Sequence, residues 1–439
     1  AQNFTHSVKK LDLDALKDFR DRFDIPLADK DLVSIPYYRP PPDSPEMVYL
    51  RERRESLGGS FPRRKTQFAP LSIPPLSRLE THTAGTRDRE ISTTMAFVRL
   101  LSALVKDTEI GKRIVPIVPD EARTFGMEGM FRQLGIYSSV GQLYEPTDTG
   151  QIMYYREDQD GQVMEEGINE GGAFAAWLAA ASSYSTHDSP LIPFYVFYSM
   201  FGFQRVGDLC WAAGDLQARG FLIGATSGRT TLNGEGLQHQ DGHSHLLAAT
   251  VPNCVAYDPT YAYELAVIIQ HGLEEMFVRR LPKYYYITAM NENYVHPPMP
   301  KGCEEGIIKG LYRLQKNSTA RSRKVVQLVG SGTILREVIA AAELLKGQFG
   351  VTADIWSATS FNELRREALA VQRWNMLHPT DKPRISYVEA CLDGTPGPVI
   401  AATDYMKAYA AQISDFVDGT FTALGTDGFG RSDTREKLR

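Results

Sequence analysis

The chain has 439 residues and a formal net charge of −5, and 43% of its residues are hydrophobic. This length exceeds what one hydrophobic core usually holds, so two or more domains are expected. The acidic balance argues against nucleic acid or an anionic membrane surface as a partner, and no apolar run is long enough to predict a membrane span.

The four cysteines, Cys210, Cys254, Cys303 and Cys391, stand far apart in the sequence. They form neither a CxxC pair nor the spacing of a zinc site. We therefore expect reduced, buried thiols and a cytoplasmic protein.

Residues 1–80 are predicted to form an arm. Apolar residues recur at helical spacing in residues 11–23, with Asp12 as a candidate N-cap. A charged helical patch follows at residues 49–59. Prolines recur between Ile35 and Pro75, which favours an extended segment running over another surface.

Strands and helices alternate through residues 81–300. Helices are expected at 90–107 (with Ser92 as a candidate N-cap), from about 172 to 185, at 203–218 and at 262–277; strands are expected at 113–119, 190–201, 221–226, 253–258 and 284–289. Such alternation predicts a parallel α/β sheet. Ligands of such sheets bind beyond the carboxyl ends of the strands.

Residues 301–439 are expected to form a second α/β domain, cut short at its end. A strand–loop–helix–strand unit covers residues 324–358, and further strands are expected within 396–406 and 419–427. The turn GSG at 330–332 is not a dinucleotide fingerprint, because Leu335 stands where the GxGxxG pattern needs glycine. The predicted fold class is therefore two parallel-sheet α/β domains behind a proline-rich arm.

Four polar segments interrupt this apolar pattern at strand ends or helix starts: residues 118–129, 165–172, 197–208 and 220–245. The last is rich in glycine and contains His239, His243 and His245 within seven residues. Because carboxyl ends of parallel strands meet at one sheet edge, we expect the four segments to form a single site.

The three histidines allow different interpretations. Three ring nitrogens in a compact loop, with Asp241 or Glu235 nearby, could hold a catalytic metal. They could instead transfer protons beside a substrate, or only make structural hydrogen bonds. The sequence leaves these alternatives open.

Acidic residues accompany two of the polar segments. Glu165, Glu166 and Glu170 precede a helix, where the helix dipole favours carboxylates even without a functional role; Asp120 and Glu121 follow a buried strand. The aromatic stripe from Phe194 to Phe203 is core by default. Its position beside the polar loops also fits a wall for a flat heteroaromatic ring.

Several segments together are specific: PDEARTFGMEGMFRQLGIYS, EEGINE, the run from Phe197 to His245, YYYITAMNENY, GSGTILREV and GTDGFGRSD. They resemble the homodimeric, thiamine-diphosphate-dependent pyruvate dehydrogenase, the decarboxylating component of the bacterial pyruvate dehydrogenase complex. The resemblance implies two transketolase-like domains: a pyrimidine-binding middle domain at 81–300 and a C-terminal domain at 301–439.

The resemblance does not extend to the amino-terminal domain, which in this family binds Mg²⁺ and the diphosphate through GDG followed by an asparagine. The chain contains no GDG. We therefore expect no metal ligands in this chain, with Mg²⁺ held on the missing domain, and we expect the chain alone to be inactive.

The resemblance also implies roles for individual residues. Glu170 resembles the carboxylate that bonds the aminopyrimidine nitrogen and favours the imino tautomer, Tyr198 and Phe201 resemble ring contacts, and Ile168 resembles the support of the bent cofactor. His239 resembles a histidine facing the pyruvate-derived adduct. The remaining matches are Asp120 and Glu121, an acidic pair in the channel, and His6, a mobile-loop histidine that assists transfer to the lipoyl group.

The function implied is thiamine-diphosphate-dependent oxidative decarboxylation of pyruvate, with transfer of the acetyl group to the lipoyl domain of the acyltransferase component. Two other hypotheses stand beside it. The chain could be a non-catalytic fragment or subunit acting in dimerisation and assembly. It could also be a metal-dependent hydrolase built on the His239, His243 and His245 loop.

Overall fold

The computed structural model describes residues 11–59, 65–119, 122–147, 155–233 and 235–439. The chain divides into two compact units, Ala1–Arg64 and Lys65–Arg439. Three residues singled out in the sequence, His6, Asp120 and Glu121, lie outside the described residues. Among the described residues, no helix is long and apolar enough to cross a membrane.

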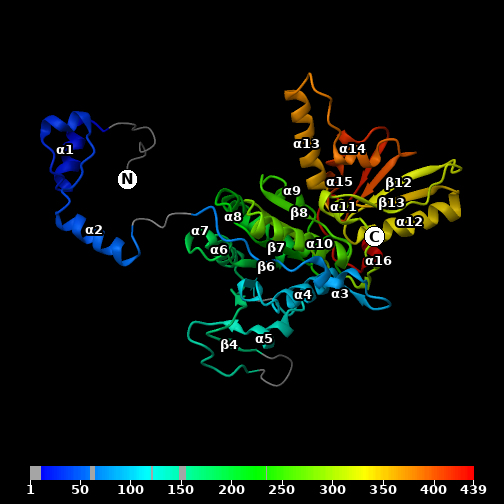
Figure 1. The fold of residues 1–439 in the computed structure, drawn as a ribbon, viewed down its shortest axis with the longest axis horizontal. Coiled ribbons are helices and arrows are strands. Elements are labelled where there is room, and N and C mark those ends of the chain that lie inside the picture. The colour runs from blue at the N-terminus through cyan, green and yellow to red at the C-terminus, as the bar shows by residue number, and fades with distance from the viewer. Residues whose placement is uncertain (1–10, 60–64, 120–121, 148–154, 234) are drawn as a thin grey trace. The chain divides into compact units, whose positions relative to one another are not determined.

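The described residues of the first unit form two α-helices, α1 (Leu13–Arg22) and α2 (Pro45–Ser56), drawn in blue in Figure 1, with a 3₁₀ turn at Asp29–Ser34 between them. The predicted N-cap is confirmed, because the Asp12 side chain accepts a hydrogen bond from the Ala15 amide at 2.8 Å. Neither helix has a buried residue within this unit.

The second unit is built on a six-stranded sheet in the order β5-β2-β6-β7-β9-β8, with every pair parallel. Its strands are β2 (Ile114–Val118), β5 (Met164–Glu165), β6 (Ile192–Tyr198), β7 (Phe221–Ala225), β8 (Cys254–Tyr257) and β9 (Tyr284–Thr288). Figure 1 shows its helices, α4 (Thr93–Leu104), α6 (Glu170–Ala181), α8 (Phe203–Asp215) and α10 (Ala262–Leu273).

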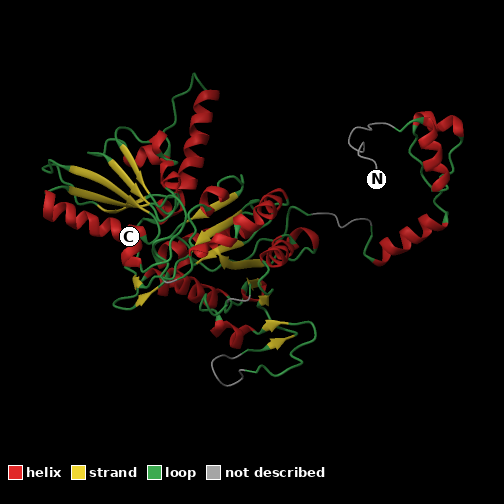
Figure 2. Cartoon of the chain, turned by 180° about the vertical axis from the view of Figure 1, so that it is seen from behind, coloured by secondary structure: helices red, strands yellow, loops and turns green. Residues whose placement is uncertain are grey.

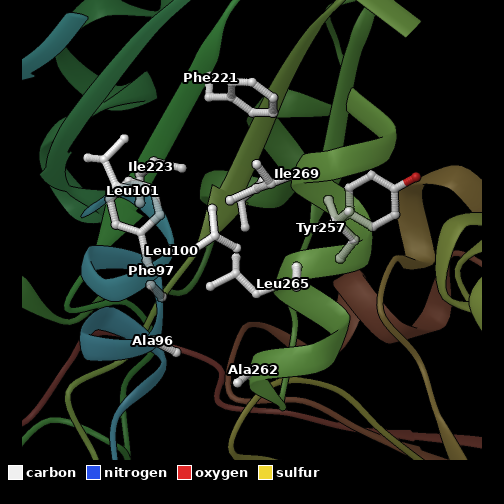
Figure 3. Close-up of a cluster of buried hydrophobic side chains, with 14 of the residues drawn as sticks. Ala96, Phe97, Leu100, Leu101, Phe221, Ile223, Tyr257, Ala262, Leu265 and Ile269 are labelled. Carbon is white, nitrogen blue, oxygen red and sulfur yellow. The ribbon is translucent and has the colours of Figure 1, made fainter. Parts of the chain in front are cut away.

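The helices cover both faces of this sheet, as the alternation of side chains along β7 requires. Phe221 and Ile223 point to the face covered by α4 and α10, where they join Leu265 and Ile269 in one apolar cluster (Figure 3). Leu222, between them, joins the opposite cluster, to which α6 contributes Trp177. A strand buried on both faces explains the unbroken apolar run in the sequence.

A second, five-stranded sheet has the order β11-β13-β12-β14-β15. Its strands are β11 (Tyr312–Gln315), β12 (Val325–Gly330), β13 (Thr352–Ser357), β14 (Val399–Ala402) and β15 (Phe421–Leu424), and its helices are α12 (Ile334–Phe349), α13 (Phe361–Leu377), α14 (Tyr387–Leu392) and α15 (Lys407–Ala411). Only β11 runs antiparallel to its neighbour. The sheet is therefore mostly parallel, with one edge strand departing from the predicted pattern.

Smaller elements complete the unit: α3 (Glu80–Thr83), β1 (Glu90–Ile91), α5 (Glu128–Leu134), β3 (Ile136–Tyr137), β4 (Glu157–Asp158), α7 (Ser183–Thr186), α9 (Ser244–Ala248), β10 (Tyr294–Val295), α11 (Glu304–Lys309) and α16 (Arg435–Leu438). The helix expected from residue 90 starts three residues later. Glu90 and Ile91 pair with β10 instead, and Ser92 caps α4 by accepting a bond from the Met95 amide at 3.0 Å. The predicted domain boundaries at residues 80 and 300 stay predictions.

Candidate active site at the strand ends of the first sheet

The carboxyl edge of the first sheet collects residues from all four polar segments, including Phe125 from residues 118–129, which packs against Tyr198. β6 ends at Tyr198 and continues into a 3₁₀ turn at Ser199–Phe201, while the loop after β7 contains a second 3₁₀ turn, Leu237–His239. Glu170 is the first residue of α6. Because the strands are parallel, these ends meet on one side of the sheet.

Three aromatic rings meet at this edge. The His239 ring centroid lies 4.7 Å from that of Tyr198 and 5.3 Å from that of Phe201, and the Tyr198 and Phe201 rings meet edge to face at 6.0 Å. Phe125 packs behind Tyr198 at 5.2 Å. The Nδ1 atom of His239 is buried and has no hydrogen-bond partner among the described residues. The site thus combines apolar walls with one available ring nitrogen.

Glu170 is held beside these rings. Asn169 caps α6 by accepting a bond from the Gly172 amide at 3.0 Å, which places the Glu170 carboxylate in the first turn, where the helix dipole stabilises it. The Glu170 side chain is only 13% exposed, and its Oε1 accepts a hydrogen bond from Arg205 Nη1 at 2.6 Å. Through Arg205, which also lies over the Phe201 ring, the structure connects Glu170 to the rings of Phe201, Tyr198 and His239.

Arg205 is a member of this cluster that the sequence analysis missed. Its guanidinium lies 4.1 Å from the centre of the Phe201 ring, so it contacts both the carboxylate and the aromatic wall. The four-residue spacing between Phe201 and Arg205 could have suggested that their side chains are in contact. This indication is weak, because exposed arginines on helices are common.

Glu235 lies in the loop that leads to His239. Burial raises the pKa of this carboxyl group, and the neighbouring His239 and Arg435 partly offset the rise. This loop therefore brings a second carboxyl group toward the ring cluster.

The other two histidines of the loop point elsewhere. His243 Nε2 lies 3.0 Å from Gln204 Oε1. His245 is fully buried, with Nε2 3.0 Å from Thr288 Oγ1 and its ring stacked on Tyr409 at 4.7 Å; burial lowers its pKa to about 4.

Among the residues that the structure describes, no group of three His, Cys, Asp or Glu side chains could hold a metal ion. The geometry of the described residues therefore does not support the hypothesis of a metal site on this loop. The contacts of His245 with Thr288 and Tyr409 are those of a buried core residue.

Ile168, two residues before Glu170, is exposed in the loop ahead of α6. Its predicted contact with a bent cofactor is not tested by the structure. The same holds for His6, Asp120 and Glu121, which the structure does not describe.

The loop after β7 is anchored to the second sheet by Asp404, at the end of β14. Its buried carboxylate accepts hydrogen bonds from the amides of Arg229 (2.9 Å), Thr230 (2.9 Å) and Thr231 (3.2 Å), and from the Thr230 hydroxyl (2.6 Å). A β-carbon on Gly228, whose φ is +85°, would collide with this carboxylate. Glycine is therefore needed where loop and carboxylate meet.

Sequence comparisons match both parts of the second unit. The family described as "Pyruvate dehydrogenase E1 component middle domain" matches residues 71–297, and the "Transketolase-like TK C-terminal domain" matches residues 310–439. Three proteins named "Pyruvate dehydrogenase E1 component" are similar over 100% of the chain: those of Pseudomonas aeruginosa (64% identical), Cupriavidus necator (56%) and Escherichia coli (54%). The chain covers 50%, 49% and 49% of these relatives, about half their length.

Solved structures show the same fold at low sequence identity. Transketolase from Campylobacter jejuni superimposes with a TM-score of 0.58 at 15% identity, covering 97% of this chain and 56% of that one. Transketolase from Leishmania mexicana gives 0.60 at 14% identity, covering 97% and 48%. Together with the parallel sheets, these likenesses establish a transketolase-like α/β fold. The middle-domain family model, which covers residues 71–297 and so more than half of the chain, decides the family: the chain belongs to the pyruvate dehydrogenase E1 component family.

Proposed function

We propose that this chain is part of an enzyme that oxidatively decarboxylates pyruvate with thiamine diphosphate and passes the acetyl group to the lipoyl domain of an acyltransferase component. The observation that carries the proposal is the Glu170 carboxylate at the start of α6, beside the rings of Tyr198, Phe201 and His239. The names of the relatives support the substrate.

The residues at this edge fit the aminopyrimidine half of the cofactor. A flat heteroaromatic ring needs apolar walls, which Tyr198 and Phe201 provide, and a partner for its ring nitrogen, which the Glu170 carboxylate provides. The buried Nδ1 of His239 is a further polar atom without a described partner. The donor and acceptor set is therefore compatible with the group.

When bound, thiamine diphosphate would supply the stabilisation of negative charge at carbon that decarboxylation requires. The chain's own residues bind, orient and transfer protons. Glu170 would hold a proton between its Oε1 and the pyrimidine nitrogen, once Arg205 releases that oxygen. Tyr198 and Phe201 would fix the plane of the ring and exclude water, and His239 would move protons at its ring nitrogens.

The Mg²⁺ and diphosphate ligands are proposed to come from outside this chain, because it contains no GDG sequence. In a homodimer the active site would lie between subunits. By itself the chain would then bind cofactor weakly and turn over negligibly. We place the protein in the cytoplasm, a proposal supported by its four free cysteines.

Replacing Glu170 tests the proposal. In a protein that combines this chain with a diphosphate-binding domain, Glu170→Gln should lower kcat by about 100-fold or more, because the amide cannot exchange a proton with the ring nitrogen. Dye-linked pyruvate oxidation measures this loss. The matched control is Glu305→Gln, an exposed carboxylate on α11 that pairs with Lys309 and should leave kcat unchanged.

Full activity of Glu170→Gln would refute the assigned role. If the wild-type protein binds the acyltransferase but oxidises no pyruvate, a non-catalytic assembly subunit becomes the better interpretation.

A further inference from the structure

The C-terminal half of α13 and the loop after it extend away from the second sheet, as Figures 1 and 2 both show. We call residues 369–385 the α13 tip. The first half of α13 is anchored by Phe361, Leu364 and Ala368, all buried. From Leu369 to Ile385 no residue is buried, and burial resumes at Ser386, which caps α14.

The side chains of the α13 tip nevertheless contact one another across helix and loop. The rings of Trp374 and His378 stack at 4.4 Å and 11°, and the Arg384 guanidinium lies 3.7 Å above the Trp374 ring. Asn375 joins helix to loop, because its side chain accepts from the Arg384 amide at 2.8 Å and donates to the Arg384 carbonyl at 2.9 Å. A segment without burial thus keeps a defined surface.

One face of the tip carries three apolar side chains and one cation. Leu369, Met376 and Leu377 have the i, i+7, i+8 spacing of one helix face, and Arg373, at i+4, lies on the same face. Met376 and Leu377 are 69% and 59% exposed, and Ile385 in the loop is 64% exposed. The buried stripe through Phe361, Leu364 and Ala368 packs on the protein, so α13 carries a second apolar stripe with no partner among the described residues.

The charge of the tip is positive in a chain whose net charge is −5. Arg373, Lys382 and Arg384 are exposed, and none forms an ion pair with any residue in the described part of the chain. Asp381 is the one acidic residue between Leu369 and Ile385. A partner for this surface needs negative charge to complement the three cations, and aliphatic side chains to cover Met376 and Leu377.

We propose that the α13 tip docks an acidic, amphipathic segment of another polypeptide. A second copy of this chain fits less well, because a two-fold contact through the tip would bring the same three cations together. Ordered arginine and tryptophan side chains at the centre of an exposed patch are the residue types that dominate binding energy at interfaces. The proposal does not depend on the reaction proposed above.

The test uses the 439-residue chain and a labelled synthetic helical peptide of about 18 residues, built from Glu, Ala and a stripe of Leu. Fluorescence anisotropy should show binding that weakens as salt rises. Arg373→Glu and Met376→Asp should each weaken it about tenfold, which corresponds to losing one central contact. The matched control is Leu344→Asp on α12, where the leucine is 57% exposed and outside the tip.

Further measurements check that the variants are folded and distinguish an acidic peptide from a membrane or a second copy of the chain as the partner. Because the substituted side chains are exposed, thermal unfolding of each variant should match the wild type. No peptide binding, equal binding by the variants, or equal binding of a Lys-for-Glu peptide would overturn the proposal. Tip-dependent binding to phosphatidylglycerol vesicles without peptide binding would replace it with a membrane surface. A dimer in sedimentation that Met376→Asp dissociates would replace it with a second copy.

Discussion

At the scale of single residues, Arg205 determines the state of the candidate site before any ligand enters. Its guanidinium occupies the Glu170 oxygen and covers one face of the Phe201 ring. A pyrimidine ring would need that oxygen and an aromatic wall. Binding therefore carries the cost of opening this ion pair.

That cost is small, because the Arg205 side chain is 47% exposed and its ion pair is screened by solvent. Arg205→Met should tighten thiamine binding by up to about fivefold, equivalent to about 1 kcal/mol. Calorimetric titration of the chain with thiamine measures the change. Weaker binding by the variant would instead mean that the guanidinium itself contacts the ligand.

Asp258, buried at the end of β8, is a second residue with a measurable consequence. Burial raises its pKa to about 7, although hydrogen bonds from Thr288 and Tyr405 oppose the rise. Its Oδ2 atom is buried and has no hydrogen-bond partner among the described residues, so a negative charge there would be poorly solvated. The pKa of an aspartate in an unfolded chain is about 3.9. Between about pH 4 and 7, Asp258 is therefore protonated in the folded protein and ionised in the unfolded chain.

Stability should therefore fall as pH rises from about 4 to 7 through this group, by up to about 4 kcal/mol. The Asp258→Asn variant lacks the titrating carboxyl group, so it should not lose stability through this group as the pH rises. The free energy of unfolding of the variant should therefore increase relative to that of the wild type between about pH 4 and 7. Urea unfolding at several pH values measures the difference. A constant difference between the two proteins would show that Asp258 does not titrate there.

Asp354 serves as a control, because its contribution to stability should change with pH in the opposite direction to that of Asp258. Burial raises its pKa, but hydrogen bonds from Ser318 and Asn317 outweigh burial and hold the pKa below its ordinary value. The stability from Asp354 is present above the unfolded pKa and is lost as pH falls. Asp354→Asn should thus lose stability at neutral pH relative to the wild type and approach it in acid.

At the scale of elements, the most consequential contact joins the loop after β7 to the end of β14. Three successive amides and one hydroxyl, from Arg229 to Thr231, converge on the Asp404 carboxylate. Asp404→Asn keeps the shape but turns one accepting oxygen into a donor that faces the Arg229 and Thr231 amides. We expect a loss of about 3 kcal/mol in the free energy of unfolding.

Chemical denaturation measures this loss, with Asp415→Asn as the control, because Asp415 is exposed. If Asp404→Asn unfolds like that control, the amide cage does not contribute to stability.

The sequence predicted most helices and strands correctly, because N-caps and apolar patterns depend on residues close together in the chain. The caps at Asp12 and Ser92 formed as expected, and the apolar run in β7 is buried on both faces. The errors lie at element ends. α10 ends at Leu273 and continues as a π-helical turn, Glu274–Val278, and α8 ends at Asp215. Ends depend on what the next segment packs against, which periodicity does not contain.

At the scale of the whole molecule, the chain covers about half the length of the relatives it matches. If the diphosphate ligands lie outside it, as we propose, then the chain should bind thiamine and thiamine diphosphate with Mg²⁺ about equally and weakly. Calorimetry compares the two ligands directly. Tight, Mg²⁺-dependent binding of the diphosphate alone would reveal an anchor within these residues.

The sequence by itself determined the alternation of strands and helices, the parallel strands of both sheets apart from the antiparallel edge strand β11, the polar segments at the strand ends and the family they resemble. These depend on neighbours along the chain. The resemblance had already pointed to His239 among the loop histidines, and only the tertiary structure showed that its ring contacts Tyr198 while His245 stacks on Tyr409. It likewise revealed the pairing of Arg205 with Glu170, 35 residues apart, and of Asp404 with Thr230, 174 residues apart. Contacts at such separations arise from how the sheets bring strand ends together, and no local pattern encodes them.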